Sequence, residues 1–402
     1  MSKEVYIVDG IRTAIGSLGG KLAPVRADDL GAFVLKSLMD RHPNLDPHLI
    51  EDVIMGCANQ AGEDNRNVAR MSVLLSGLPF TIGGETVNRL CASGMAAAIN
   101  ASRAIKDGAG DLYIAAGVEQ MTRAPWVMSK SSAPFGRDMQ LFDSSFGWRF
   151  INPQMEALYG VDSMGMTAEN LAERYNISRE EQDAFALWSQ QKVALATTSG
   201  YYEGEIAPIS IPQKKGEALV FDKDEFPRPS TNKDSLSGLR PAFKKTGSVT
   251  AGNASGLNDG AAALLLASEE ACKKHSLVPL ARIVSAAISG VEPAYMGIGP
   301  VLASQKALER AGLTLDDIAI IEINEAFAAQ VLACLKELNI NSNDPRVNPK
   351  GGAIALGHPL GMSGARILLS AARQLQETNK RYALVTMCIG VGQGYATIIE
   401  RA

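Results

Sequence analysis

Cys91 is the first residue of this chain whose surroundings could support chemistry. It lies in the segment Asn88–Met95, and the run that follows, residues 96–105, is rich in small apolar residues and is typical of a buried helix. A thiol near a helix N-terminus is close to unpaired backbone N–H groups, which favour a negative charge. We therefore expect Cys91 to form its nucleophilic thiolate nearer neutral pH, the alternative being an inert core cysteine.

His358 could supply the base that such a thiol needs. It lies in a segment from Asn348 to Gly364 that holds five glycines and shows no regular period. Glycines in such number indicate backbone that passes close to another group, and Pro359 fixes the chain just after the imidazole. A histidine that only satisfies backbone groups in a turn is the alternative. The other histidines lie in segments typical of exposed connections: His42, His48 and His275.

Cys388 is a second thiol whose position could support chemistry. It follows an apolar, strand-like run at residues 382–387 and precedes the glycine-rich segment 390–394. Catalytic groups often lie where a rigid element ends. No helix follows the glycine-rich segment, so it does not fit the dinucleotide-binding fingerprint, and we exclude a Rossmann fold.

The composition is that of a globular α/β enzyme. The 402 residues are 46% hydrophobic and 20% charged and include 38 glycines, which is enough chain for two or three domains. A net charge of −4 without long basic runs argues against nucleic acid and membranes as partners. The five cysteines are odd in number and include no Cys-x-x-Cys pair, which argues against disulfides and a zinc site. Without an apolar signal region, a cytoplasmic location is expected.

Two regions of the chain share one order of elements: a glycine-containing loop, a buried helix, a strand and a Gly-Val-x-Gln sequence. The regions begin at Val87-Asn88 and at Val347-Asn348. A weaker likeness joins residues 49–56 to residues 315–322. We therefore predict two homologous α/β halves with a ligand site at their junction.

Residues 123–250 differ in character from both halves. All three tryptophans lie there, and Ser178 with Glu181 three residues later forms the capping box of a helix. We interpret this region as an inserted, lid-like domain. The predicted organisation is an N-terminal half at 1–122 plus 251–276, the insertion at 123–250, and a C-terminal half at 277–402.

Four motifs together resemble those of the thiolase family, in the same order and across nearly the whole chain. They are Asn-Arg-Leu-Cys91-Ala-Ser-Gly, Asn324-Glu-Ala-Phe, Gly-His358-Pro-Leu-Gly and Cys388-Ile-Gly-Val-Gly-Gln-Gly. The resemblance implies an α/β fold of two duplicated halves, packed in a layered αβαβα arrangement with an inserted loop domain. It also implies that coenzyme A (CoA) is a substrate, that no cofactor or metal is bound, and that the chain forms a homodimer or homotetramer.

The same resemblance assigns a role to each reactive residue. Cys91 is the nucleophile that takes up the acyl group as a thioester, and His358 is the base that activates it and a donor to an oxyanion. Cys388 is the acid and base for the substrate α-carbon, and Asn324 stabilises an oxyanion through a bound water. The backbone N–H of Gly390 completes a second oxyanion site. For Asn324 the alternative is an ordinary cap of the helix that follows.

Other positions match the family's contacts to its substrates. Arg228, Ser235, Ser255 and Met164 are the expected contacts to CoA. If the acyl chain carries a second carboxylate, the expected partners are Arg149 and Arg123 in the lid region.

Segments 56–67 and 146–164 resemble those of the thiolases that act on β-ketoadipyl-CoA in aromatic-compound degradation. Ser163 stands where acetoacetyl-CoA thiolases would have a histidine, although Gly165-Met166 departs from the Pro-Glu pair of the chosen subgroup. The expected reaction is the CoA-dependent cleavage of 3-oxoadipyl-CoA to succinyl-CoA and acetyl-CoA, as in the β-ketoadipate pathway.

Several alternatives to that reaction stay open. An acetyl-CoA C-acetyltransferase and a broader 3-ketoacyl-CoA thiolase of fatty acid metabolism would use the same reactive residues. A ketosynthase-like enzyme usually carries a second catalytic histidine where this chain has Cys388. A non-catalytic acyl-CoA-binding protein of the same fold would be expected to have lost one of the reactive residues.

Overall fold

A single mixed sheet runs through both halves of the chain. The computed structural model describes residues 3–402. Nine strands follow one another across the sheet, and the two-residue strand β2 (Gly16–Ser17) pairs with β10 beside them. The order is β4 (Glu85–Val87), β3 (Asp52–Gly56), β5 (Leu112–Gln120), β10 (Asn258–Ser268), β1 (Val5–Arg12), β11 (Ala281–Gly290), β14 (Gln393–Arg401), β13 (Tyr382–Ile389) and β12 (Ile318–Ile323).

The two halves repeat one strand arrangement on either side of a short seam, where β1 meets β11 through two residue pairs. In the N-terminal half β3 is parallel to both β5 and β4, the strand that ends at Val87. In the C-terminal half β12 is parallel to β13, and Val347 forms a parallel bridge to Ile321. Val347 thus takes the place that Val87 has in the first half, and the predicted duplication is confirmed.

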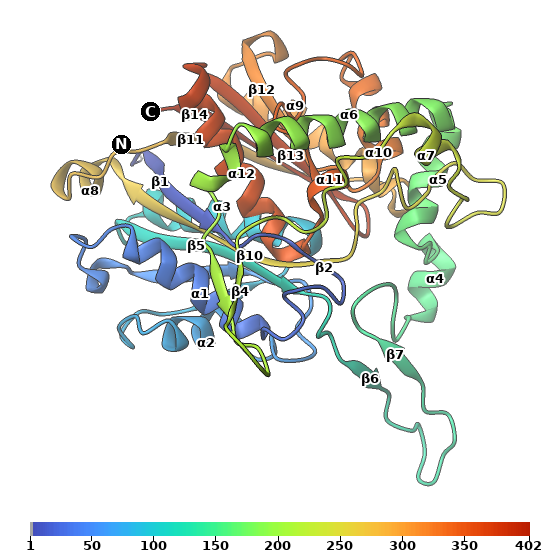
Figure 1. The fold of residues 1–402 in the computed structure, drawn as a ribbon, viewed down its shortest axis with the longest axis horizontal. Coiled ribbons are helices and arrows are strands. Elements are labelled where there is room, and N and C mark those ends of the chain that lie inside the picture. The colour runs from blue at the N-terminus through green and yellow to red at the C-terminus, as the bar shows by residue number, and fades with distance from the viewer. Residues whose placement is uncertain (1–2) are drawn as a thin grey trace.

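Helices cover the sheet in layers. One apolar cluster joins the outer face of the N-terminal strands to α1 and α2, and another joins the outer face of the C-terminal strands to α9 and α10. A third cluster lies between the two halves around α3 and α12, which Figure 1 shows near the middle of the molecule. The predicted αβαβα arrangement is therefore confirmed. The helices are α1 (Ala27–Asp40), α2 (Val68–Leu75), α3 (Ser93–Asp107), α9 (Gly299–Ala311), α10 (Ala328–Glu337) and α12 (Leu360–Thr378).

Small residues allow the central helices to approach each other and the sheet. A Cβ on Gly94 in α3 would lie 2.5 Å from the carbonyl oxygen of Gly361 in α12. A Cβ on Gly117 in β5 would overlap that same oxygen. The alanines of α3 likewise allow close packing. Strand β10 is buried along its whole length, because helices cover both faces of the sheet here.

The inserted region packs against both halves. Ser178 and Glu181 form the predicted capping box at the start of α6. The buried Arg12 of β1 pairs with Glu205 at 3.0 Å and with Asp224 at 2.7 Å, which ties the sheet to this region. Figure 1 shows the β6–β7 hairpin projecting away from the body. Its elements are β6 (Trp126–Met128), β7 (Leu141–Asp143), α4 (Pro153–Tyr159), α5 (Met164–Arg174), α6 (Arg179–Thr198), β8 (Ile209–Ile211), β9 (Leu219–Phe221) and α7 (Lys233–Ser237).

Two short helices remain, α8 (Glu269–Lys274) after β10 and α11 (Ala353–Leu356) before the His358 loop. Among residues 3–402, no helix combines the length and the apolar character that crossing a membrane would require.

We predict that Gly117→Ala destabilises the protein by about 1–3 kcal/mol, because the new methyl group must displace the backbone of α12. The measurement is the free energy of unfolding in urea. Gly290→Ala is the matched control, since Gly290 also lies in a strand and a Cβ there meets no atom within 4 Å. Equal stability of the two variants would contradict the close approach of α12 to β5.

Candidate active site

The turn that carries Cys91 is held by local hydrogen bonds. Cys91 lies in a 3₁₀ turn, Leu90–Ala92, that leads directly into α3. Asn88 Oδ1 accepts the N–H of Leu90 at 2.9 Å, and Leu90 has the positive φ of 48°. Ser93 Oγ accepts the N–H of Arg89 at 2.8 Å and donates to Leu90 O at 2.7 Å. The sulfur is thereby placed at the helix N-terminus, as the sequence indicated.

The expectation of a depressed Cys91 pKa is wrong. Burial raises the pKa of Cys91 to about 11, although the backbone N–H groups of Gly390 and of Cys91 itself act in the opposite direction. The carboxylate of Glu119 adds to the rise in the pKa. Loss of water from the thiolate therefore outweighs the helix N-terminus. The resting Cys91 side chain is therefore a neutral thiol, which would need a base to act as a nucleophile.

The hydrogen bonds of His358 determine which ring nitrogen carries the proton. Ser363 Oγ donates to Pro359 O at 2.8 Å, so its lone pairs face His358 Nδ1 at 2.7 Å. Nδ1 is therefore the N–H donor, and Nε2 is left as the basic atom. Burial, assisted by the positive charge of Arg366, lowers the pKa of His358 to about 3. The imidazole is neutral at physiological pH.

Asn324 lies directly after β12 and beside this imidazole. Its side chain is almost fully buried, and Nδ2 is 3.4 Å from His358 Nε2. Its Oδ1 accepts no hydrogen bond from a described protein group. The alternative reading as a helix cap is wrong, because the following helix α10 begins at Ala328 and has Phe327 at its N-cap.

Cys388 completes the group at the carboxyl end of β13. Because β12 and β13 are parallel, Asn324 directly after β12 and Cys388 near the end of β13 lie at the same end of the sheet. Cys388 is fully buried, and this burial raises its pKa well above the usual value, with Cys91 as the next contributor. The N–H of Gly390, two residues on, faces the sulfur of Cys91. The structure thus brings together the reactive side chains that the sequence singled out.

Cys388 of β13 belongs to a small apolar cluster. Its other members come from α5, the segment before β10, the turn before α9 and the segment before α10. Met164, one of the predicted CoA contacts, packs against it from the first turn of α5, and a Cβ on Gly390 would lie 3.6 Å from the Met164 sulfur. The other members are Ala168, Val249, Ala254, Met296, Ala326, Phe327 and Phe243.

The remaining predicted CoA contacts differ in their surroundings. Ser255 is half-buried and its N–H donates to Ala326 O at 2.9 Å, so it borders the apolar cluster. Arg228 and Ser235 are exposed. Ser235 Oγ donates to Asn232 O at 2.8 Å and caps α7, which is a structural use of this side chain.

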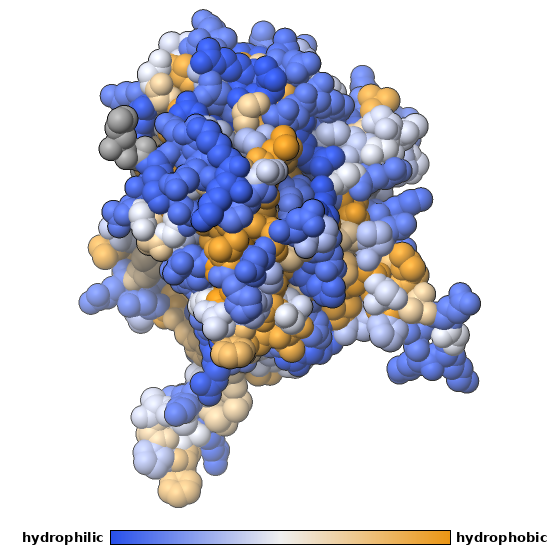
Figure 2. Space-filling model, turned by 90° about the vertical axis from the view of Figure 1, so that its left-hand side faces the viewer, coloured by the Kyte–Doolittle hydropathy of each residue, from blue (hydrophilic) through white to orange (hydrophobic). Residues whose placement is uncertain are grey.

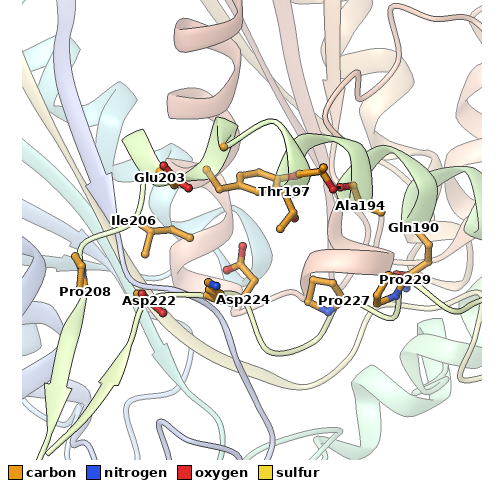
Figure 3. Close-up of a pocket in the computed structure, with 14 residues that line it drawn as sticks. Gln190, Ala194, Thr197, Glu203, Ile206, Pro208, Asp222, Asp224, Pro227 and Pro229 are labelled. Carbon is orange, nitrogen blue, oxygen red and sulfur yellow. Dashed lines mark hydrogen bonds between the residues drawn. The ribbon is translucent and has the colours of Figure 1, made fainter.

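A separate pocket of about 600 Å³ lies between α6 and residues 206–229, as Figure 3 shows. None of the reactive residues lines it. Its charged lining consists of Glu203, Asp222 and Asp224 against Lys223. Because these carboxylates repel phosphate, the pocket does not fit the anionic end of CoA.

The two arginines predicted to hold a distal carboxylate are not equivalent. Arg123 already pairs with Glu63, whose Oε2 lies 2.7 Å from its Nε. Arg149 is half-buried and donates to Ser144 O at 3.3 Å, with no carboxylate partner within the described chain. The same Ser144 oxygen accepts from Asn59 at 3.2 Å, which places Arg149 near the loop that supports the Cys91 turn.

Cys57, Asp64 and Glu119 offer ligand atoms within 4.8 Å of one another. Both oxygens of Glu119 already accept backbone N–H groups, and the Cys57 thiol donates to Asn59 O at 2.7 Å. Burial raises the pKa of Cys57 well above its usual value, whereas a metal requires the thiolate. This cluster fits a hydrogen-bonded core better than a metal centre.

Sequence reasoning missed the residues that orient His358. Ser363 fixes the protonated nitrogen, and it lies within the same glycine-rich segment, so a polar group five residues after the histidine was the available signal. Asn258 at the start of β10 accepts the N–H of His358 at 2.9 Å and donates to Gly16 O at 3.0 Å. Nothing in the sequence near Asn258 pointed to that contact, which spans 100 residues.

Comparison with known proteins assigns this arrangement to a family. The model of the thiolase N-terminal domain matches residues 5–270, and that of the thiolase C-terminal domain matches residues 277–401. The chain belongs to the thiolase family, whose members are acyltransferases.

Similar proteins extend over the full length of the chain. A 3-oxoadipyl-CoA/3-oxo-5,6-dehydrosuberyl-CoA thiolase of Escherichia coli is 57% identical over 99% of this chain and 100% of its own. A β-ketoadipyl-CoA thiolase of Acinetobacter baylyi is 56% identical with the same coverage. The crystal structure of human mitochondrial 3-ketoacyl-CoA thiolase in complex with CoA has a TM-score of 0.91 and 41% identity, covering 100% of this chain and 98% of that one.

We predict that iodoacetamide alkylates Cys91 before the other four cysteines, because Cys91 is half-buried and the others are buried. The alkylation rate should rise about tenfold per pH unit between pH 7 and 9, since the thiolate fraction does so below a pKa of about 11. Mass spectrometry of wild type and Cys91→Ser locates the label. A rate that is independent of pH in this range would instead indicate a thiolate–imidazolium pair.

Proposed function

We propose that this protein is a thiolase that cleaves 3-oxoadipyl-CoA with CoA, giving succinyl-CoA and acetyl-CoA through an acyl thioester on Cys91. The observation that carries the proposal is the arrangement of two uncharged groups, the Cys91 thiol and the His358 imidazole, at the junction of the two halves. The Nδ1–H of His358 is engaged by Ser363, which leaves Nε2 as a base, and the Cys91 turn packs beside the start of α12.

In the first half-reaction the Cys91 proton passes to His358 Nε2 as the sulfur attacks the 3-keto carbon of the substrate. The attack forms a tetrahedral oxyanion, which the imidazolium and Asn324 stabilise. Asn324 Oδ1 is free of protein donors and can accept from a water that donates to the oxyanion. Collapse of the oxyanion breaks the bond between carbons 2 and 3.

Cys388 is proposed to protonate the carbon that leaves. The electron pair of the broken bond passes into the enolate of acetyl-CoA, and the thiol of Cys388 transfers its proton to carbon 2. The raised pKa of Cys388 keeps it protonated for this step. Acetyl-CoA departs, and the succinyl group remains on Cys91 as a thioester.

The second half-reaction returns both cysteines to their resting state. The thiolate of Cys388 takes the proton of the incoming CoA thiol, whose sulfur attacks the thioester carbonyl. The new oxyanion is proposed to accept hydrogen bonds from the backbone N–H groups of Cys91 and Gly390. In the resting enzyme both of these groups face the Cys91 sulfur. Succinyl-CoA leaves, and Cys91 recovers its proton from His358.

Coenzyme A is proposed to reach the two cysteines along the apolar cluster, with Met164 and Ser255 beside the pantetheine arm. Arg228 and Ser235 are proposed for the exposed nucleotide end. The names of the relatives described above support CoA esters of a keto diacid as substrates, and Ser163 supports the same subgroup.

We predict that Cys91→Ser lowers thiolysis of 3-oxoadipyl-CoA by at least about 1,000-fold, because a serine hydroxyl is a far weaker nucleophile beside a neutral imidazole. Loss of enolate absorbance measures the rate, and mass spectrometry detects the succinyl adduct on wild-type Cys91. Acetoacetyl-CoA and a long-chain 3-ketoacyl-CoA are assayed in parallel. A preference for either would retain the mechanism and reject the diacid substrate.

We predict that Arg149→Gln lowers kcat/KM for 3-oxoadipyl-CoA by about 10- to 100-fold, the worth of one charge-assisted hydrogen bond. The same change should leave acetoacetyl-CoA within about twofold, because that substrate lacks the distal carboxylate. Arg123→Gln is the matched control, since Glu63 already occupies that guanidinium. Equal losses for both substrates would exclude Arg149 as the carboxylate partner.

The enzyme is further proposed to be a cytoplasmic homodimer or homotetramer, divided at residues 1–122 plus 251–276, 123–250 and 277–402. The free cysteines are typical of a reducing compartment. Exposed apolar side chains on the projecting hairpin, in the last turn of α2 and just after it support self-association. Figure 2 shows apolar residues gathered in the lower middle of one face among hydrophilic ones. The exposed side chains include Leu74, Leu75, Phe80, Trp126, Met128, Phe135 and Leu141.

A further inference from the structure

We infer that Glu119 is a positioning residue that holds the Cys91 turn and the His358 loop in register by bridging the two halves of the chain. Glu119 lies near the carboxyl end of β5 and is 1% exposed. It contacts neither sulfur nor imidazole through a hydrogen bond, so it would act only through other groups. The inference rests on the thiolase chemistry proposed above for Cys91 and His358.

The carboxylate accepts backbone N–H groups from both halves. Oε1 accepts from Asn59 at 2.8 Å, and Oε2 accepts from Ala58 at 3.0 Å and from Gly361 at 2.8 Å. Asn59 and Ala58 follow β3 in the N-terminal half, whereas Gly361 lies in the first turn of α12 in the C-terminal half. A carboxylate at this helix N-terminus is also favoured by the helix dipole.

The hydrogen bond from Ala58 connects Glu119 to the turn that carries Cys91. Ala58 O accepts from Asn88 Nδ2 at 3.0 Å, and Asn88 Oδ1 accepts the N–H of Leu90 at 2.9 Å. Leu90 is held at a positive φ, and Cys91 comes next. A shift of Ala58 would therefore move the turn that aims the sulfur.

The hydrogen bond from Gly361 connects Glu119 to the loop that carries His358. Gly361 is two residues from Pro359, whose carbonyl accepts from Ser363 Oγ, and Ser363 in turn accepts from His358 Nδ1. The first turn of α12 thus carries both the anchor to Glu119 and the partner of the imidazole. One buried carboxylate therefore fixes the separation between acceptor and donor of the first proton transfer.

The surroundings of Glu119 show that its hydrogen bonds matter. Burial is the main cause that raises the pKa of Glu119 to about 7; the three backbone N–H groups oppose this rise, and the charge of Asp64 contributes to it. Cys57 also lies within this group. Nothing in the proposed reaction uses a carboxylate here, and the three N–H groups would be unpaired and buried without it.

The test is Glu119→Gln in the full-length enzyme. The single amide oxygen of glutamine can replace only one carboxylate oxygen, so at least one of the three N–H groups must face an NH₂ group. We expect kcat for thiolysis to fall by about 10- to 100-fold while KM for CoA stays within about twofold, because misaligned groups slow the chemistry and not the binding. Alkylation of Cys91 by iodoacetamide should also change in rate.

Glu322→Gln is the matched control, because Glu322 is equally buried, has its pKa raised to about 7 and bonds to Gln374 instead of to either loop. If Glu119→Gln lowers the melting temperature but leaves kcat and the alkylation rate unchanged, Glu119 is merely structural and the inference is overturned. If Glu119→Gln does not fold, Glu119→Asp, which is too short to reach both halves, is measured in the same way. Thiolysis by wild type without an acyl-Cys91 adduct would instead overturn the proposed function.

Discussion

Everything at the reactive centre depends on how closely α12 can approach α3 and β5. The two helices begin beside each other, one just after Cys91 and the other just after His358, so their separation sets the distance between thiol and base. Gly94, Gly117 and Gly361 allow backbone to touch backbone at this point. A duplicated fold is well suited to this constraint, because the equivalent loops of both halves meet at one seam and each half can supply one reaction partner.

The same packing determines the electrostatics of the site. Burial raises the pKa of Cys91 to about 11 and lowers that of His358 to about 3, so both groups are uncharged before substrate arrives. A thiolate–imidazolium pair would have to form against both desolvation costs. The proton is therefore best transferred as the sulfur attacks, when the growing charge moves from the thiol to an oxygen that faces hydrogen-bond donors. A neutral pair also leaves the resting thiol less open to chance alkylation or oxidation.

The sequence predicted the fold and singled out the candidate reactive side chains because both leave local traces. The repeated order of loop, helix and strand predicted two halves, and the motifs around Cys91, Asn324, His358 and Cys388 marked residues at the ends of regular elements. The direction of the Cys91 pKa could not be predicted in this way, because the helix N-terminus is a local feature whereas burial depends on α12 and on β13. Arg123 could not be separated from Arg149 either, because the Glu63 that pairs with Arg123 lies 60 residues away.

The duplication also shows how corresponding strands acquire different tasks. β5 and β13 are corresponding strands of the two halves. Each carries a buried acidic group near its carboxyl end, Glu119 in β5 and Cys388 in β13. The carboxylate meets three backbone N–H groups and is fully used by them. The thiol of Cys388 faces an apolar cluster and has no strong partner, which leaves its proton available for a carbon atom. The contrast lies in the surroundings of each strand end, since one half supplies a carboxylate held by backbone N–H groups and the other supplies the proposed acid.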